Sequence, residues 1–426
     1  MNNNWALPAQ EKGNYVVGLP KLSTPSVRWP CRRIGALLAT LAIGLASPAI
    51  AQFTPNEALV SPNRGLVDAE YSQSRARIVW TDPLGNLWLG GINRATGAFE
   101  PVSGKGLLIA TGAVSKWNMF LWNGPEWISM ASGDQISYSH YLPGKPRTAA
   151  NTRMALAVQD QSGAWVTQTL SPNLPRMSNI SSDDPGDSNA RIMYFDPYLN
   201  HYWRNVLDPS SEQILAFLPQ TNKAWRFARG VRAVLYTAPV NGVPQVFRYM
   251  LDTQASEQLT SDSGAKDTER TVPWMWPAPE FGGDFVFSTF VNGSELRVYR
   301  RLVAPNGALQ WRPIYSASLP AGRTAGSPQW FIYNGKSYLY WTVYVSPNDF
   351  PSEIWISNID SGKPLLRRIS DDKKLRVRND PEHFITTNSG PLIYYNRYDP
   401  SIDPAHPMCS ACSEGVFSAD AGLAGS

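Results

Sequence analysis

The chain has 426 residues, of which 43% are hydrophobic and 17% charged, so it can bury a substantial core and is not intrinsically disordered. Its 35 prolines, 32 glycines and 16 tryptophans are typical of short strands joined by tight turns, with aromatic rings packed between them, which favours an all-β fold. The formal charge of +4 comes from residues 1–51, where five basic groups accompany one acid, and 4 − 4 = 0 remains for the rest; this removes the electrostatic argument for binding nucleic acid.

The N-terminal segment has the pattern of a signal peptide. Arg32 and Arg33 precede an apolar run, IGALLATLAIGLA, that is too short to span a bilayer, and small residues follow at Ala49 and Ala51. We therefore expect residues 1–51 to be a signal peptide that is cleaved after Ala51, and the mature protein to be periplasmic or secreted. No later segment is apolar enough to predict a membrane span.

One strand-like segment recurs along the chain. ARIVWTDP (76–83) returns as ARIMYFDP (190–197), and looser copies follow as RAVLYTAP (232–239) and PLIYYNRYDP (391–400). β-branched and aromatic residues that end at an Asp or Pro turn signal are typical of a buried strand. A second strand follows most copies directly, so the repeated unit contains a β-hairpin.

The first hairpin strands are roughly fifty residues apart, and no helical pattern interrupts them. This period predicts a β-propeller over residues 52–400, with about four antiparallel strands in each blade. The seventh unit stops after two strands, so it either is completed by N-terminal strands or merges with the first unit, and six and seven blades both fit. The central residues of the seven strands are Ile78, Ile136, Ile192, Val234, Val286, Leu339 and Ile393.

Residues 401–426 are interpreted as a C-terminal tail rich in Pro, Ser and Gly. Cys409 and Cys412 are the two cysteines left after removal of the signal peptide, and in an exported protein this spacing predicts a disulfide that closes a small ring. Ser413 stands where a haem attachment motif would need His.

Four units carry a related tripeptide ahead of the hairpin strand: PEW (125–127), PEF (279–281), PQW (328–330) and PEH (381–383). A catalytic residue is needed once, whereas a residue that recurs in successive blades usually does the same structural work in each. We therefore interpret Glu280 and its counterparts as scaffold, accepting hydrogen bonds from the backbone of a neighbouring blade.

Two families share features with this pattern. The signal peptide, the PEW and PEF tripeptides and the segment QVFRYMLDTQASEQLTSD (245–262) resemble the TolB-like group of WD-type propellers, which implies a non-enzymatic binding platform over about residues 60–400. The SPDG turn typical of that group is missing. The segments WPAPEFGGDFVFSTF (276–290) and SPQWFIYNGKSYLYWTVY (327–344) are similar to strands of the five-bladed glycosidases that act on arabinan and xylan.

The glycosidase resemblance implies a carbohydrate-active enzyme as the alternative function. Asp68 would then serve as the base, Glu280 matches the APE position, and Glu126 or Glu382 would assist. The family's acid would precede GP or AP, where this chain has Gly326 and Ser327 before a proline. In inverting glycosidases the two catalytic carboxyl groups stand roughly 6.5–9.5 Å apart, which leaves room for the attacking water molecule.

The remaining candidates concern ligands. Trp127, Trp274, Trp276 and Trp330 are expected to stack on sugar rings or to fill gaps between blades, and His383 occupies a position where other units have an aromatic ring. No cofactor or catalytic metal is expected, because the four histidines form no metal-binding motif. Asp183, Asp184 and Asp187 form a weak calcium candidate that an Asp-rich turn also explains. The sequence thus predicts a propeller that binds a protein or glycan ligand at one channel mouth.

Overall fold

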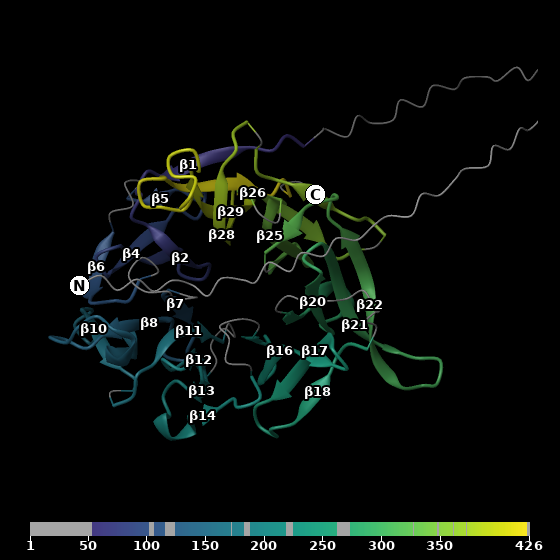
Figure 1. Cartoon of the computed structure of the whole chain (residues 1–426), viewed down its shortest axis with the longest axis horizontal. Coiled ribbons are helices and arrows are strands. Elements are labelled where there is room, and N and C mark those ends of the chain that lie inside the picture. The colour runs from purple at the N-terminus through teal and green to yellow at the C-terminus, as the bar shows by residue number, and fades with distance from the viewer. Residues whose placement is uncertain are drawn as a thin grey trace, which may run out of the picture. The chain divides into compact units, whose positions relative to one another are not determined.

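The computed structural model describes residues 53–101, 106–115, 124–171, 173–182, 188–218, 225–261, 273–326, 328–346, 349–360, 362–371 and 373–423. These residues form seven antiparallel sheets, the blades of a seven-bladed β-propeller (Figure 1). The all-β propeller predicted from the repeat is confirmed, and the blade count is seven. The predicted signal peptide lies outside the described residues.

The first four blades, numbered along the chain, consist of consecutive strands. Blade 1 contains β2 (Val67–Ser72), β3 (Arg77–Thr81), β4 (Asn86–Ile92), β5 (Phe99–Glu100) and β6 (Leu107–Thr111). Blade 2 contains β7 (Glu126–Ile128), β8 (Gln135–Tyr141), β9 (Thr152–Gln159) and β10 (Trp165–Thr169). Blade 3 contains β11 (Met177–Ser181), β12 (Arg191–Phe195), β13 (His201–Asn205) and β14 (Gln213–Ile214). Blade 4 contains β15 (Trp225–Phe227), β16 (Ala233–Val240), β17 (Val243–Met250) and β18 (Ser256–Gln258).

The last three blades follow the same plan until the ring closes. Blade 5 contains β19 (Trp274–Pro277), β20 (Phe285–Val291), β21 (Glu295–Val303) and β22 (Leu309–Ser318). Blade 6 contains β23 (Thr324–Ala325), β24 (Gln329–Tyr333), β25 (Lys336–Ser346), β26 (Asp349–Asn358) and β27 (Leu366–Arg368). Blade 7 contains β28 (Val377–Thr386), β29 (Gly390–Tyr398), β30 (Ser413–Asp420) and β1 (Glu57–Ser61). Three short 3₁₀ turns are η1 (Ala149–Asn151), η2 (Pro209–Ser211) and η3 (Pro279–Phe281).

The core lies between neighbouring blades. Each of the seven aliphatic residues falls in the second strand of a different blade, if β23 and β24, which both pair with β25, count together as the first strand of blade 6, and each is at most 1% exposed. The contact between blades 5 and 6 illustrates the packing, because Trp276 and Phe290 of one blade pack with Leu339 and Trp341 of the next. A branched apolar side chain at this central strand position is therefore required by packing, which explains why it recurs.

The Asp that ends two of the repeated strands is structural. Asp82 accepts hydrogen bonds from the backbone N–H of Leu84 and Asn86, at 2.9 Å each, and from the indole of Trp88 at 2.8 Å. Asp196 accepts hydrogen bonds in the same pattern, from the backbone N–H of Tyr198 and Asn200 and from the Tyr202 hydroxyl. The turn signal read from the sequence thus corresponds to a carboxylate that organises the hairpin loop.

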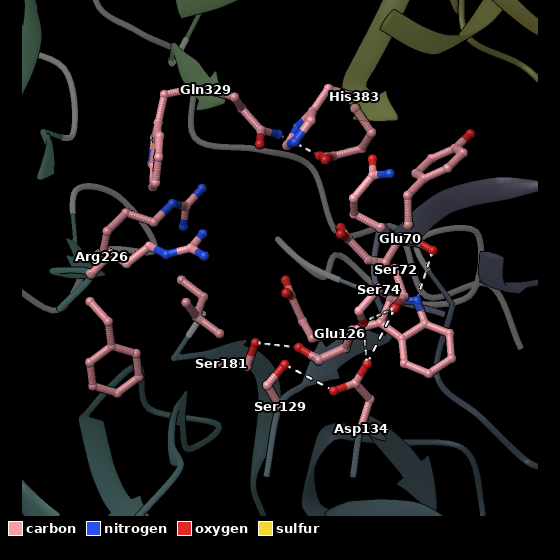
Figure 2. A pocket seen from close by; sticks show the side chains of 18 of the residues that line it. Glu70, Ser72, Ser74, Glu126, Ser129, Asp134, Ser181, Arg226, Gln329 and His383 are labelled. Atoms are coloured by element: carbon pink, nitrogen blue, oxygen red, sulfur yellow. Dashed lines mark hydrogen bonds between the residues drawn. The ribbon is translucent and has the colours of Figure 1, made fainter. Parts of the chain in front are cut away.

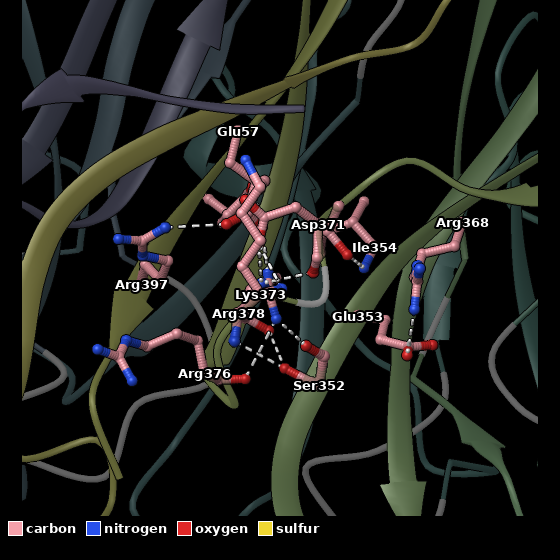
Figure 3. A network of polar contacts seen from close by, with 12 residues as sticks. Glu57, Ser352, Glu353, Ile354, Arg368, Asp371, Lys373, Arg376, Arg378 and Arg397 are labelled. Carbon is pink, nitrogen blue, oxygen red and sulfur yellow. Dashed lines mark hydrogen bonds and ion pairs between the residues drawn. The ribbon is translucent and has the colours of Figure 1, made fainter. Parts of the chain in front are cut away.

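The N-terminal strand closes the ring. β1 pairs antiparallel with β30, with Glu57 opposite Ala419, and is the outer strand of blade 7. The Glu57 side chain, 1% exposed, forms an ion pair with Arg378 of β28 and accepts a hydrogen bond from Arg397 Nη1 at 2.9 Å (Figure 3). It also accepts a hydrogen bond from the Tyr395 hydroxyl at 2.7 Å. A buried carboxylate with three donors from two other strands fixes β1 in register.

The C-terminal residues differ from the sequence interpretation. Ser413–Asp420 form β30, the third strand of blade 7, so the domain boundary placed at residue 400 falls inside that blade. The segment reads as a tail because a loop of Pro, Ser and Asp precedes it and separates it from β29. Cys409 and Cys412 are joined by a disulfide in this loop, where buried Cys412 packs against Val377 and Tyr398. Among the described residues, none of the helices has the length and hydropathy that a membrane crossing requires.

Candidate functional site

A pocket of about 520 Å³ lies where the first strands of the seven blades meet. Residues of β2, β7, β11, β15, β19, β24 and β28 all line it, so its wall combines side chains that are far apart in the sequence (Figure 2). This volume is in the range typical of small-ligand sites, and a ring of packed sheets gives the wall little freedom to move.

One side of the pocket is acidic. The acidic side consists of five carboxylates from the adjacent blades 1, 2 and 7, namely Asp68, Glu70, Glu126, Asp380 and Glu382. A sixth carboxylate, Asp134, also lines the pocket, but it accepts hydrogen bonds from Ser74 at 2.8 Å and Ser129 at 3.0 Å and pairs with Arg75 at 3.3 Å.

Backbone bulges shape this wall. The register of β2 shifts between Val67 and Glu70, where Asp68 has a left-handed φ of 55°, and β28 shifts in the same way around Asp380, whose φ is 59°. A third bulge in β11 includes Ser178 at φ 52°. Left-handed backbone costs a non-glycine residue energy, least for Asp and Asn, and a bulge re-aims the side chains beside it. Two of the strands that carry the carboxylates, β2 and β28, thus each have one residue with a strained backbone in the pocket wall.

The crowding of carboxylates changes their acidity. Burial raises the pKa of Glu70 well above its ordinary value, and the negative charges of the other four carboxylates of the acidic side raise it further. The same environment raises the pKa of the neighbouring Tyr71, again mainly through burial. Ionised oxygens at these positions repel one another, so this environment favours protonation of Glu70.

The opposite side of the pocket is basic. The basic side consists of Arg226 of β15 and Arg229, which follows that strand, and Figure 2 shows Arg226 across the pocket from Glu70 and Glu126. The Arg226 guanidinium lies 5.2 Å from the ring centroid of Trp274, and Arg229 lies 5.2 Å from that of Trp330. These cation–π contacts hold both arginines against the wall.

His383 lies between the two sides. Its Nδ1 is 3.2 Å from the Tyr340 hydroxyl, and its ring stacks on Phe331 with centroids 5.2 Å apart. Burial, and secondarily the positive charge of Arg229, lowers the pKa of His383 to about 4. The imidazole is therefore neutral in the pocket at physiological pH and acts as a packed hydrogen-bonding group.

Glu280 does not belong to the pocket. It lies in η3, and its carboxylate accepts hydrogen bonds from the backbone N–H and the hydroxyl of Ser337 in blade 6, both at 2.9 Å. The PEF tripeptide is not equivalent to PEW, PQW and PEH, because those three lie in the first strands β7, β24 and β28 while PEF follows the first strand of blade 5. Glu126 and Glu382 line the pocket, and Glu382 also accepts a hydrogen bond from the side chain of Gln329 in blade 6, so the scaffold interpretation stays a prediction for these two residues.

The aromatic candidates divide in the same way. Trp127, Trp274, Trp330 and His383 line the pocket, whereas Trp276 is fully buried and stacks on Trp330 with centroids 5.1 Å apart. Asp183, Asp184 and Asp187, the calcium candidate, lie outside the described residues. Within the described residues no cluster of His, Cys, Asp or Glu has an arrangement that could hold a metal ion.

Sequence reasoning found Asp68, Glu126 and Glu382 but missed Glu70, Asp380 and both arginines of the basic side. Glu70 and Asp380 each stand two residues from a candidate, and i, i+2 spacing on a first strand was the available signal. Arg226 and Arg229 gave no such signal, because β15 is only three residues long and lacks the tripeptide, and Arg229 lies beyond its end.

Comparisons with known proteins give no family for the chain. No family model matches it, and a search of curated proteins finds no match. A search of solved structures finds the β-propeller domain of Myceliophteria thermophila Cps50 (Swd1), with 10% sequence identity over 84% of this chain and 96% of that chain and a TM-score of 0.49. Neither the TolB-like nor the glycosidase resemblance is supported by these matches.

Proposed function

We propose that the protein is an exported, non-enzymatic binding scaffold that takes a segment of a protein partner into the pocket at the centre of the propeller. The observation that supports this most is the convergence of an acidic side and a basic side on one cavity, each built by different blades. Such a wall offers fixed charges to a polar ligand on a frame that does not have to reorganise, which favours binding.

Export rests on the sequence and is part of the proposal. The signal-peptide pattern of residues 1–51 supports it, and so does the Cys409–Cys412 disulfide, because disulfides persist in oxidising compartments. Mass spectrometry of the protein recovered from the exported fraction of an expressing culture should give a mature chain that begins at Gln52. A chain that keeps Arg32 and Arg33 would contradict export by this route.

The state of the tryptophans favours a protein ligand over a glycan. A sugar ring stacks on an open aromatic face, but Trp330 is only 8% exposed and is contacted by both Trp276 and Arg229. Trp274 carries Arg226 on its ring, and the Trp127 indole donates to the Glu70 carbonyl at 3.1 Å. The rings thus hold the charged side chains in place, and the charges remain as the recognition elements.

Peptide and glycan arrays test this proposal. The mature protein should bind a subset of peptides, and Ser129→Trp, which places a large ring in the pocket wall, should abolish that binding. Val303→Trp, at a residue 68% exposed and outside the pocket, is the matched control and should bind like the parent protein. Binding that survives in Ser129→Trp, or binding to glycans alone, would contradict the proposal.

A glycoside hydrolase remains the second candidate, because Asp68, Glu126 and Glu382 line one pocket together with Glu70, a carboxyl whose pKa is raised as a general acid requires. The test is release of reducing sugars from a panel of plant and bacterial polysaccharides. If the protein is such an enzyme, Glu126→Gln and Glu382→Gln lose activity while Glu280→Gln keeps it, since Glu280 lies outside the pocket. Absence of release from every polysaccharide supports the binding function.

A further inference from the structure

His383 has one ring nitrogen engaged with the protein and one that is not. The residue lines the pocket from β28, and its Nδ1 lies 3.2 Å from the hydroxyl of Tyr340 in blade 6. Its Nε2 makes no hydrogen bond to any residue that the structure describes, and the atom keeps accessible surface. What Nε2 offers to a ligand depends on whether it carries a proton.

The side-chain amide of Gln329, which also lines the pocket, has one allowed orientation (Figure 2). Its nitrogen donates to the carbonyl oxygen of Pro381 at 3.1 Å and to the carboxylate of Glu382. A backbone carbonyl oxygen can only accept, so the NH₂ group must face Pro381 and the amide oxygen must point the other way. That oxygen lies 3.2 Å from the Tyr340 hydroxyl, which therefore donates to it.

These contacts decide which nitrogen of His383 carries the proton. The Tyr340 hydroxyl has a single hydrogen, and because this hydrogen is directed at Gln329, the hydroxyl oxygen accepts the Nδ1–H of His383. Burial lowers the pKa of His383 to about 4, so the ring is neutral and holds one N–H. With that proton on Nδ1, Nε2 presents a lone pair.

We infer that Nε2 of His383 accepts a hydrogen bond from an uncharged N–H or O–H group of the ligand, and that Gln329 and Tyr340 are positioning residues that fix the tautomer. This inference rests on the proposed binding function and names one recognition contact of that site. The charge that acts on the pKa of His383 is the positive charge of Arg229, which disfavours an ammonium or guanidinium donor at this atom. A ligand without a donor here would leave the nitrogen unsatisfied, which gives selectivity.

NMR spectra of the protein with ¹⁵N-labelled histidines test the tautomer without any ligand. Two-bond ¹H–¹⁵N correlations at pH 7, assigned by their loss in His383→Phe, should show a proton on Nδ1 and none on Nε2. Tyr340→Phe keeps the ring and removes the acceptor of Nδ1–H, so it should move the proton towards Nε2. His406, which lies outside the pocket, should be unchanged in Tyr340→Phe. A proton on Nε2 of His383 in the parent protein would overturn the inference.

Three small probes test the contact itself. N-methylacetamide offers an uncharged N–H, N,N-dimethylacetamide keeps the carbonyl but has no donor, and methylammonium offers a charged donor. N-methylacetamide should shift the Nε2 resonance of His383 in a saturable way, whereas the other two should not. Equal shifts with N,N-dimethylacetamide, a larger shift with methylammonium, or no saturable shift with N-methylacetamide would each overturn the inference.

Substitutions of His383 separate the contact from packing. His383→Phe keeps a ring to stack on Phe331 and lacks Nε2, so it should weaken binding of the peptides that the arrays select about tenfold. His383→Gln carries an amide oxygen that can accept and should recover part of this loss. His406→Phe, at a histidine whose side chain is 79% exposed, is the matched control and should bind like the parent protein. Melting temperatures check that each variant is folded.

The outcomes distinguish this inference from the proposed function. If Ser129→Trp abolishes peptide binding but His383→Phe binds as tightly as the parent protein, the binding function stands and the role of Nε2 is overturned. If no peptide binds in a pocket-dependent way, the proposed function fails, and the NMR probes alone decide whether Nε2 is an acceptor.

Discussion

Glu280 and Ser337 join two neighbouring blades: the carboxylate of Glu280 accepts the backbone N–H and the hydroxyl of Ser337, both at 2.9 Å. The Ser337 hydroxyl also accepts the indole N–H of buried Trp276 at 2.9 Å. Glu280 resembles a catalytic residue in the sequence, where tryptophans and glycines flank it. In the structure it is part of the contact between blades 5 and 6 and does not line the pocket.

Replacement of Glu280 should therefore change stability and not binding. Glu280→Ala removes two hydrogen bonds from a half-buried site and should lower the free energy of unfolding by about 1–3 kcal/mol. Urea denaturation followed by tryptophan fluorescence measures this change, and the peptide affinity of the folded variant should equal that of the parent. A variant of full stability that has lost ligand binding would place Glu280 in the site and contradict its structural role.

Glu57 should be essential for closing the ring. Glu57→Ala removes the nearer of two carboxylates from the buried Arg378 and leaves Asp371 at 3.7 Å, and removal of one member of a buried pair costs roughly 3–5 kcal/mol. Asp284→Asn, which removes the partner of Arg300 at a site where the carboxylate is 58% exposed, is the control and should cost less than about 1 kcal/mol. Equal losses in the two variants, measured by denaturant unfolding, would contradict the role of Glu57 in closure.

The same carboxylate predicts a pH dependence. Burial opposes ionisation of Glu57, but the hydrogen bonds and charge of Arg378, with Tyr395 and Arg397, prevail and hold its pKa below the ordinary value of 4.5. A lowered pKa contributes stability that is complete above pH 4.5 and is lost as pH falls through the lower folded value. Unfolding free energies measured from pH 6 to pH 3 should fall less steeply in Glu57→Ala than in the parent protein.

The lowered pKa of His383 predicts a loss of stability that begins at a higher pH than the loss caused by protonation of Glu57. Its pKa is lowered to about 4 in the folded state, whereas the unfolded residue titrates near 6.5. Between these values the unfolded chain binds a proton that the folded chain does not, so stability falls as pH drops from about 6.5 towards 4. In NMR spectra the ring signals that disappear in His383→Asn should not shift between pH 7.5 and 5.5; a midpoint inside this interval would contradict a buried neutral ring.

Asp380 should contribute to the raised pKa of Glu70. Asp380→Asn removes one of the negative charges that raise this pKa and keeps a side chain that tolerates the left-handed φ of 59°, so it should lower the pKa of Glu70 towards its ordinary value. Asp380→Ala should be less stable than Asp380→Asn, because alanine adopts this backbone at a cost of about 1 kcal/mol. NMR titration of the Glu70 carboxyl measures its pKa, calorimetric melting temperatures compare the two variants, and an unchanged pKa in Asp380→Asn would contradict the contribution of Asp380.

The closure of the ring explains why the blade number could not be settled from the sequence. The repeat identified the second strand of every blade, because an aliphatic residue between two neighbouring blades must recur wherever that contact recurs. β1 and β30 carry no copy of the repeat, since each fills an outer or third position in a blade assembled from both ends of the chain. Pairing between residues 57 and 419 leaves no local pattern in either segment.

The sequence by itself determined the hairpin turns held by Asp82 and Asp196, because these turns depend on contacts within a few residues. It also determined the repeated strands and hence the propeller, because the packing that requires them is shared by every blade. Only the tertiary structure decided which carboxylates act together. Glu280 contacts the next blade and Glu126 lines the pocket although both stand in similar tripeptides, because Glu126 lies in the first strand of its blade and Glu280 lies in a 3₁₀ turn after the first strand. Glu70 gained its unusual environment from Asp380 and Glu382, charges more than 300 positions away along the chain that ring closure brings beside it.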